Sequence, residues 1–367
     1  MVIAPLQEGD RLMPTIAHRR LLTQRLAGPK FAAPAEVVAH FGAVQAQEYL
    51  PALWAVGQRT VGATEAIIEQ AINDRQLVRT WPLRGTIHLV TPADIRWLLA
   101  LSAPRQLRMT PRQQQLGLDE ATFAQSRRVV ARALSDGQPR PRPELRQVLD
   151  DAGISTAGQR GIHIMGRLAQ EGLICIGPRQ GKQHTFVLLD AWLPPAREWT
   201  RDEALAKLAR RYFTSHGPAT LKDYTWWSGL AAAEARAGLA MVKGQLEHDV
   251  AGREVYWFAA TPVGELPSPS AHLLPFYDEY LVAYKDRRAV LPPEHNALAD
   301  SRNIIFHQPI LVNGRVAGTW LRELKADVVI LRPTLFRHLT GAERDALGAA
   351  AERYGAFLGL RAELVMA

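Results

Sequence analysis

The pattern of apolar and polar positions divides the chain into a helical part and a strand-rich part. Residues 14–27 carry apolar side chains at helical spacing, and Gly28 and Pro29 end that segment. The next elements follow the order of a winged helix: a short helix at 34–41, a helix containing Leu53 and Trp54, a helix opened by Thr64 as its N-cap, and a hairpin at 79–90 that turns near Pro82 to Gly85. We therefore predict a winged helix here.

The same order of elements returns twice. The second set has helices at 127–134, 144–153 and 158–170 and two strands within 175–189; the third has helices at 203–217, 220–230 and 231–242 and a strand at 253–260. In the segment 158–174, Ile162, Met165, Leu168 and Leu173 are spaced for one buried face. The recurrence indicates a structural repeat of three winged-helix units without residue-level identity.

From about residue 262 the pattern changes to strands rich in β-branched and aromatic residues. Strands are predicted at 273–284, 302–312, 316–324 and 326–336, a hairpin turn at Asn313-Gly314, and a last amphipathic helix at 341–359. The predicted fold class is α+β, with three tandem winged-helix (helix-turn-helix) units and a C-terminal β-barrel-like domain. The predicted domains are 14–120, 121–195 and 196–261, one winged helix each, and 262–367, the β-barrel-like α+β domain.

Charge and cysteine content narrow the classes of partner. The 367 residues include 44 Lys plus Arg against 36 Asp plus Glu, a formal net charge of +8, which favours a polyanionic partner. An alternative is the plain solvated surface of an Arg- and Ala-rich protein. The single cysteine, Cys175, excludes an internal disulfide framework and a Cys-rich metal cluster. No apolar run reaches membrane-spanning length, and the N-terminus lacks a signal pattern, so we expect a cytoplasmic protein.

Two glutamines, Gln45 and Gln47, stand just before an apolar segment. In a helix, residues two apart point in different directions, whereas in extended backbone they point the same way and Ala46 turns inward. Pro51 favours the second arrangement, because proline suits the first turn of a helix and biases the residue before it away from helical geometry. We predict an irregular entry to a helix that starts near Pro51. The alternative role of the pair is capping a helix or bracing a loop.

Four motifs together resemble one known family. VQAQ, LVRTWPLRGTIHLV, LLPFYDEYLVAYKDR and NGRVAGTW are similar to motifs of the AlkZ-type DNA glycosylases, winged-helix enzymes that remove bulky alkylated or crosslinked purines. The resemblance runs from about residue 15 to beyond 360. It implies a C-shaped molecule with DNA in a concave channel, and a catalytic motif of glutamine, an apolar residue and glutamine, here Gln45, Ala46 and Gln47. A related bacterial subgroup has Asp at the second position, so Gln47 places this chain with the crosslink-unhooking branch.

The chemistry of two amides limits what such a site does. A glutamine amide cannot take a proton at neutral pH, so neither Gln45 nor Gln47 is a general base. An N7-alkylated purine is already cationic and leaves without an enzymic acid. Two amide oxygens can then hold a water below the anomeric carbon and favour the developing positive sugar. We predict a monofunctional glycosylase without metal or cofactor that leaves an abasic site, since no nucleophilic lysine stands near Gln45.

Basic side chains on the predicted winged helices are the candidate DNA contacts, because a winged helix commonly places its third helix in a groove and its wing on the backbone. They are Arg79, Arg84 and His88 on the first hairpin, Arg160 and Arg167 on the helix at 158–170 with Gln159 and His163 on the same polar side, Arg179 and Lys182 on the second wing, and Arg315 in the turn at 313–315. For His88 the alternative is a hydrogen-bonded core histidine. For the turn at 313–315, the alternative to probing a groove is an ordinary surface turn.

Asp278 and Glu279, with Asp286 nearby, form the only acidic cluster that resembles a carboxylate site. Their neighbours lack the spacing of metal ligands, so we expect them to orient arginines or cap the barrel. The chain has no phosphate loop, nucleotide fingerprint or Ser-His-Asp order.

Two functions follow from these patterns. The first is a monomeric repair glycosylase acting on double-stranded DNA with alkylated purines, at the nucleoid and away from membranes. The second is a winged-helix transcriptional regulator that binds DNA without catalysis, although such regulators are commonly dimers and no dimer helix is evident.

Overall fold

The protein is described by a computed structural model that covers residues 8–260, 268–291, 304 and 307–366, with side chains from Ile16 onward. The chain forms two compact units. The first contains Met1–Glu69 and Leu205–Ala367, and the second contains Gln70–Ala204. The predicted domain boundary between residues 261 and 262 falls in a segment outside the described residues. The division into two units is coarser than the four predicted domains.

The N-terminal part of the first unit is helical, as its spacing predicted. It contains α1 (Glu8–Thr23), α2 (Pro34–Phe41), the short strand β1 (Val44–Gln45) and α3 (Tyr49–Gly57), and it ends within α4 (Glu65–Asn73). Thr64 accepts a hydrogen bond from the Ile67 amide at 3.3 Å, so the predicted N-cap is confirmed. Proline at the first position of α2 lacks the amide that a helix start leaves unpaired in any case.

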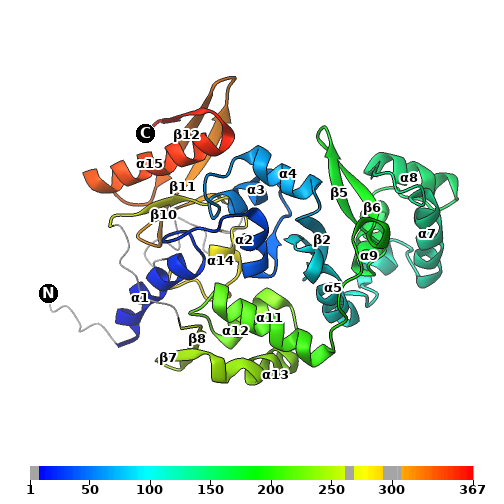
Figure 1. The fold of residues 1–367 in the computed structure, drawn as a ribbon, viewed down its shortest axis with the longest axis horizontal. Coiled ribbons are helices and arrows are strands. Elements are labelled where there is room, and N and C mark those ends of the chain that lie inside the picture. Colours follow the sequence, from blue (N-terminus) through cyan, green and yellow to red (C-terminus); the bar gives the residue numbers. More distant parts are fainter. Residues whose placement is uncertain (1–7, 261–267, 292–303, 305–306, 367) are drawn as a thin grey trace. The chain divides into compact units, whose positions relative to one another are not determined.

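The second unit is built around a mostly antiparallel sheet. Its elements are β2 (Val78–Leu83), β3 (Thr86–Val90), α5 (Pro92–Gln106), α6 (Pro111–Gln115), α7 (Glu120–Ala133), β4 (Arg140–Pro141), α8 (Arg142–Asp151), α9 (Arg160–Gln170), β5 (Ile174–Gln180), β6 (Gln183–Leu188) and α10 (Leu189–Trp192). Within this unit the strand order is β3, β2, β5, β6, β4. Arg84 and Gly85 both have positive φ and form the predicted hairpin turn. Helices α7, α8 and α9 followed by the β5–β6 hairpin have the order of a winged helix (Figure 1).

The buried face of α9 differs from the predicted one. Ile162 is 62% exposed, while Gly161, Ile164, Met165 and Leu168 are buried. Positions 161, 164, 165 and 168 follow the three-and-four spacing of one helical face, and 162 lies off that face. The prediction for Ile162 was wrong because this apolar residue, near the start of the helix, was assigned to the buried face although its position lies off that face.

The third predicted repeat lies mainly in the first unit. It contains α11 (Arg201–Ser215), α12 (Leu221–Ser228), α13 (Ala232–Val242), the short 3-10 helix η1 (Lys243–Gln245) and a hairpin of β7 (Glu247–Ala251) and β8 (Glu254–Phe258). Strand β7 was not predicted, because its sequence, EHDVA, is polar and mostly exposed. The helices predicted for the first repeat lie mainly in the first unit and its hairpin in the second. The number of winged-helix units stays a prediction.

The C-terminal part of the first unit is a strongly curled half-barrel sheet. Its strand order is β13 (Arg361–Leu364), β12 (Val328–Leu335), β11 (Arg315–Leu324), β10 (Pro309–Val312) and β9 (Ala271–Leu273). Only the β12–β13 pair is parallel. Helix α15 (Gly341–Leu358) packs on this sheet (Figure 1). Of the predicted strand at 302–312, residues 302, 303, 305 and 306 lie outside the described residues.

The predicted strand at 273–284 was wrong. The segment continues from β9 through a loop into a short helix, α14 (Glu279–Val282). Tyr277 has positive φ, and Asp278 accepts a hydrogen bond from the Tyr280 amide, which starts the helical turn. The segment is almost wholly buried, so it lacks the alternation of polar and apolar residues that would distinguish helix from strand.

Gly57 at the end of α3 gives a test of the packing between α3 and α15. A Cβ at this position would overlap Cε2 of Phe357, and Phe357 is 2% exposed and packs on Trp54. Helix propensity favours Ala over Gly by about 1 kcal/mol. Overpacking of a buried ring outweighs this, so we expect Gly57→Ala to lower the free energy of unfolding by about 1–3 kcal/mol. In urea unfolding, adding Phe357→Leu should recover part of the loss; a stabilised single variant would contradict the prediction.

Candidate functional site

The glutamine pair lies in a short extended segment between α2 and α3. Gly42 has a φ of 83°, which ends α2, and Val44–Gln45 then form β1. Ala46 is fully buried, Gln45 is 7% exposed and Gln47 is exposed. Extended backbone at Gln45 and the buried Ala46 agree with part of the predicted local structure. The strand ends at Gln45, and the shared direction of the two glutamine side chains stays a prediction. Helix α3 begins at Tyr49, two residues before the predicted start, so Pro51 falls in its first turn.

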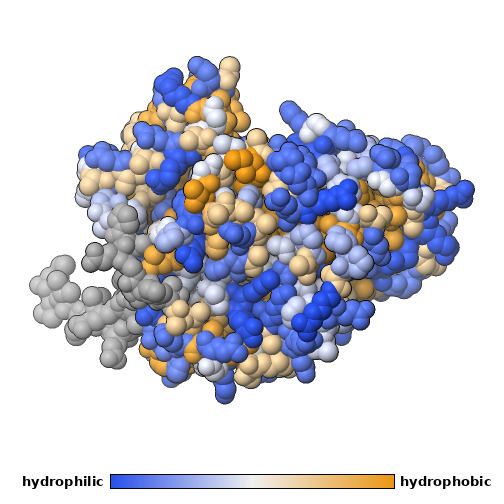
Figure 2. Space-filling model, viewed as in Figure 1, coloured by the Kyte–Doolittle hydropathy of each residue, from blue (hydrophilic) through white to orange (hydrophobic). Residues whose placement is uncertain are grey.

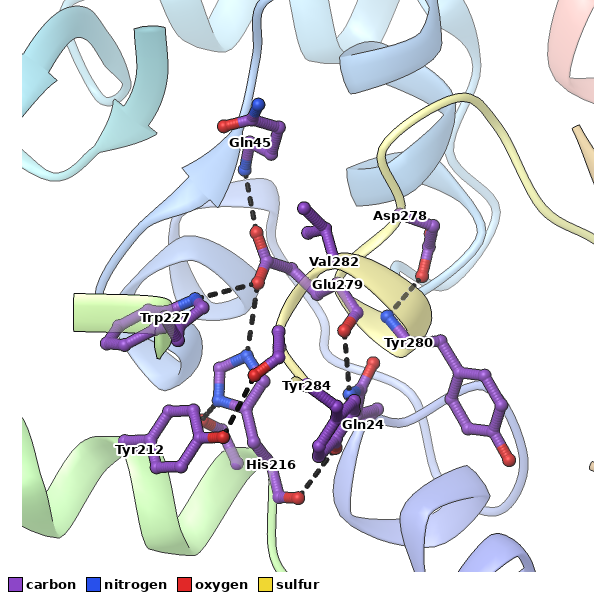
Figure 3. Close-up of polar contacts among 12 residues, drawn as sticks. Gln24, Gln45, Tyr212, His216, Trp227, Asp278, Glu279, Tyr280, Val282 and Tyr284 are labelled. Atoms are coloured by element: carbon purple, nitrogen blue, oxygen red, sulfur yellow. Dashed lines mark hydrogen bonds and ion pairs between the residues drawn. The ribbon is translucent and has the colours of Figure 1, made fainter. Parts of the chain in front are cut away.

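The backbone of this segment is held by a carboxylate that lies 234 residues further along the chain. The backbone N–H of Gln45 donates to Oε1 of Glu279 at 2.8 Å. Oε2 of Glu279 accepts the Trp227 indole N–H at 2.9 Å and lies 3.2 Å from Nε2 of His216. Figure 3 shows the backbone nitrogen of Gln45 facing Glu279 and its side-chain amide on the opposite side. The carboxylate therefore fixes the backbone and leaves the amide group to face elsewhere.

His216 is fully buried among aromatic rings. Its ring stacks on Tyr212 with centroids 4.7 Å apart and contacts Phe41 and Trp227. Burial is the largest influence on its pKa and lowers it, although the Glu279 carboxylate opposes the shift. We infer a neutral imidazole that donates from Nε2 to Glu279. Its Nδ1 lies 2.8 Å from Oγ of Ser215, but this Ser-His-Glu arrangement is buried, so a substrate cannot reach the hydroxyl.

Asp278 forms a second buried carboxylate site beside the first. Its oxygens accept two hydrogen bonds from Arg59, at 2.7 and 2.9 Å, and one from the Gln58 amide at 3.1 Å. Arg59 and Asp278 are each about 1% exposed or less as side chains. The predicted role of orienting an arginine is therefore observed for Asp278. The contact of Glu279 with the glutamine segment was not predicted; the sequence signal was a pair of acidic residues inside an apolar run.

The first hairpin of the second unit presents fewer exposed basic groups than predicted. Arg79 is 1% exposed and its Nη1 lies 3.1 Å from Nδ1 of His184 on β6. Burial, followed by the nearby arginines, lowers the pKa of His184 to about 4, so this imidazole accepts the bond. His88 is fully buried, with Nδ1 2.9 Å from the Thr86 carbonyl oxygen, which favours the alternative of a core histidine. Arg84 is half-buried in the hairpin turn.

Basic residues on α9 and its wing fall into two groups. Arg167 is 7% exposed and binds Glu120, Glu171 and the Leu107 carbonyl, so it holds α9 to α7 and to the end of α5. Arg160 donates to the carbonyls of Ser155 and Gly117. On the β5–β6 wing, Arg179 is half-buried and Lys182 is exposed. Of these four, Lys182 has the most exposed side chain.

The turn at Asn313-Gly314 joins β10 to β11, as predicted. Asn313 exchanges hydrogen bonds with the backbone of Ser270, and the Tyr280 hydroxyl donates to the Gly314 carbonyl at 2.8 Å. Gly314 is buried, and a Cβ there would contact Tyr280, Ala17 and Leu21 at 3.1 to 3.2 Å. These contacts favour an ordinary structural turn over a groove probe. The role of Arg315, which is half-buried, stays a prediction.

Hydrophilic residues cover most of the face shown in Figure 2, and apolar ones gather in smaller groups. The exposed large apolar side chains include Val61, Ile67 and Ile162. Among the described residues, His, Cys, Asp and Glu side chains do not gather in threes as metal ligands would. None of the helices in the described part of the chain is long and apolar enough to cross a bilayer.

Comparison with known proteins gives one consistent result. The family model described as DNA glycosylase AlkZ-like matches residues 38–357. An interstrand DNA cross-link repair glycosylase from Streptomyces sahachiroi is 30% identical over 314 residues, which cover 78% of this chain and 81% of the relative. The solved structure of the Streptomyces sahachiroi DNA glycosylase AlkZ has the same fold, with a TM-score of 0.79 and 23% identity over 96% of this chain and 99% of that chain. This chain belongs to the AlkZ-like DNA glycosylase family.

Proposed function

We propose that this protein hydrolyses the N-glycosidic bond of bulky N7-alkylated or crosslinked purines in double-stranded DNA and leaves an abasic site. The observation that carries the proposal is the motif Gln45–Ala46–Gln47 at the end of the short strand Val44–Gln45, with Ala46 buried and Gln47 exposed. The relative from Streptomyces sahachiroi is named for interstrand cross-link repair. We extend that substrate class to this chain.

The proposed mechanism uses the two amides to place a water molecule. Both glutamines lie in the short segment between α2 and α3, so the Gln45 and Gln47 side-chain amides would serve one water. Their oxygens would hold it below the anomeric carbon and favour the oxocarbenium-like sugar. Because the alkylated base is already cationic, it leaves without an acid from the protein. An amide pair without a strong base would act mainly on bonds that the lesion has weakened, which would protect normal purines.

The proposed DNA contacts are basic groups that the structure leaves at least partly exposed. Lys182 and the half-buried Arg179 on the second wing, Arg84 in the first hairpin turn and the half-buried Arg315 meet this condition. Contacts within the second unit engage the guanidinium groups of Arg79, Arg160 and Arg167. We propose that these three and the buried His88 support the DNA-binding elements from inside. We also propose a monomeric enzyme that works at the nucleoid in the cytoplasm.

Arg84 offers a test of the phosphate contacts. Its φ of 52° is tolerated by asparagine, so Arg84→Asn removes the charge with little backbone strain. Each neutralised phosphate contributes about 0.9 to the slope of log affinity against log salt concentration. We expect the slope for duplex DNA to fall by about that amount in this variant, measured by fluorescence anisotropy from low to moderate salt. An unchanged slope, with Gln147→Asn as the surface control, would remove Arg84 from the interface.

Base loss distinguishes the enzyme from a regulator that only binds. Duplex DNA carrying a single N7-alkylguanine is incubated with the protein and then treated briefly with warm dilute alkali, which breaks the strand at abasic sites. Breaks are counted in excess of a sample without protein, because hot alkali alone also breaks DNA at an intact N7-alkylguanine. We expect breaks at the alkylated purine and none at normal purines. Binding without breaks would contradict the proposed function. Breaks that form without heat and alkali would show a strand-cutting enzyme and contradict the monofunctional part.

A further inference from the structure

Glu279 lies at the centre of a buried set of hydrogen bonds that joins three distant parts of the first unit. Its side chain is 1% exposed. Three N–H donors reach its carboxylate (Figure 3): the backbone N–H of Gln45 in the segment after α2, the indole N–H of Trp227 on α12, and Nε2 of His216, which directly follows α11. The carboxylate is thus the point through which the third predicted repeat contacts the backbone of the glutamine motif.

The donors favour the ionised form of this carboxylate. Each donor is an N–H group, and a carboxylate that accepts several N–H bonds is stabilised in its charged form. Bonds to a charged acceptor are also stronger than bonds between neutral groups. His216 contributes as a neutral donor, since burial lowers its pKa. The Glu279 oxygen Oε1 that accepts the Gln45 backbone N–H lies 2.8 Å from that nitrogen.

Further hydrogen bonds hold the residues around Glu279 in place. Nδ1 of His216 lies 2.8 Å from Oγ of Ser215, and the His216 carbonyl oxygen accepts a hydrogen bond from the Tyr284 hydroxyl at 2.6 Å. The Tyr284 hydroxyl in turn accepts from the Gln24 amide at 2.9 Å, and Gln24 also donates to the Glu279 carbonyl at 3.3 Å. A carboxylate fixed at both its backbone and its side chain has little freedom to move. The Gln45 nitrogen that it binds is fixed with it.

We propose that Glu279 is a positioning residue for base excision: its carboxyl group anchors the backbone of Gln45, so that the glutamine amides keep the geometry needed to aim a water. This inference rests on the proposed function. Glu279 itself does not reach the substrate, because it is buried and the Gln45 side chain lies on the opposite side (Figure 3).

Glu279→Gln removes the charge and keeps the size of the side chain. An amide offers a single acceptor oxygen, so either the Gln45 or the Trp227 N–H would face an NH₂ group instead of an oxygen. Trp227→Phe is a second variant, which removes one donor to Oε2 and leaves the bond from Gln45 to Oε1 in place. Tyr280→Phe is the matched control: it lies on the same short helix, and the hydroxyl bonds that it loses go to Ala17 and Gly314, outside the glutamine segment.

The test is single-turnover excision of N7-methylguanine from a duplex oligonucleotide, together with the Kd for that duplex and the Tm of each variant. We expect Glu279→Gln to lower the excision rate constant at least tenfold with Kd changed less than twofold, Trp227→Phe to lower it less, and Tyr280→Phe to keep the original rate despite a lower Tm. An unchanged rate in Glu279→Gln would overturn the positioning role. Equal loss of rate in Tyr280→Phe would also overturn it, because a general loss of packing would then explain both.

Failure of the proposed function gives a different result. In that case the unchanged protein releases no base, and hydrogen exchange of the peptide containing Gln45 still tests the anchor. We expect faster exchange of that peptide in Glu279→Gln than in Tyr280→Phe. Equal exchange in the two variants would refute the anchor whatever the activity of the protein.

Discussion

Gln47→Ala should lower the single-turnover rate constant for base excision by about a hundredfold or more while leaving DNA affinity nearly unchanged. Loss of a group that orients a reacting water or stabilises developing charge costs on the order of 10² to 10³ in rate. Gln47 is exposed, so its truncation leaves the folded structure with little new strain. The measurement is excision of N7-methylguanine with enzyme in excess over DNA. Equal rates for the variant and the unchanged protein would remove Gln47 from catalysis.

Gln45→Ala should reduce the rate to a similar degree and also lower the Tm. Gln45 is only 7% exposed, so its truncation removes buried contacts as well as the amide. Its backbone bond to Glu279 persists in the variant, which separates this change from Glu279→Gln. Gln147→Ala is a suitable control, because that exposed glutamine binds only the side chain of Asp151 among the hydrogen bonds described. Its rate should equal that of the unchanged protein.

Local spacing was sufficient to predict the parts of the structure that local forces decide. The helix at 34–41 was predicted with the residues it has, and the extended segment at Gln45 followed from Pro51 and the two-residue spacing. Helix α5 was not predicted, since its apolar residues are spread around the axis and Pro104 lies inside it. Periodicity carries no signal for a helix that lacks a single apolar face.

Tertiary contacts decide the features that the sequence could not reveal. Glu279 is adjacent to Asp278 in sequence, yet one binds the glutamine segment and the other binds Arg59. Nothing in the spacing of two neighbouring carboxylates distinguishes these partners, which lie more than two hundred residues away. Similarly, the sequence predicts a DNA contact for a basic residue on a helix expected to enter a DNA groove. The structure shows instead that Arg167 on this helix forms ion pairs with Glu120 and Glu171.

Asp278→Asn should lower the free energy of unfolding by about 3–5 kcal/mol, the cost of removing one partner from a buried ion pair. The loss arises because Arg59 would keep its charge in a site where it is about 1% exposed. Urea unfolding at neutral pH gives the value. Asp249→Asn is the control, since the Arg19–Asp249 pair is partly exposed and should contribute less than about 1 kcal/mol.

The double variant Arg59→Met, Asp278→Asn separates the cost of an orphaned charge from the net contribution of the pair. If most of the single-variant loss comes from the unpaired guanidinium, removal of both charges should cost clearly less than the sum of the two single changes. Additive losses would instead show that each group stabilises the fold through its other contacts, which for Arg59 include the backbone carbonyls of Gln24 and Ala55 and the side-chain oxygen of Gln24. For Asp278 the other contact is the helix cap: its side chain accepts the Tyr280 amide at the start of α14, of which Glu279 is the first residue. Additive losses would therefore indicate that Asp278 positions Glu279 through this cap and not through the ion pair with Arg59.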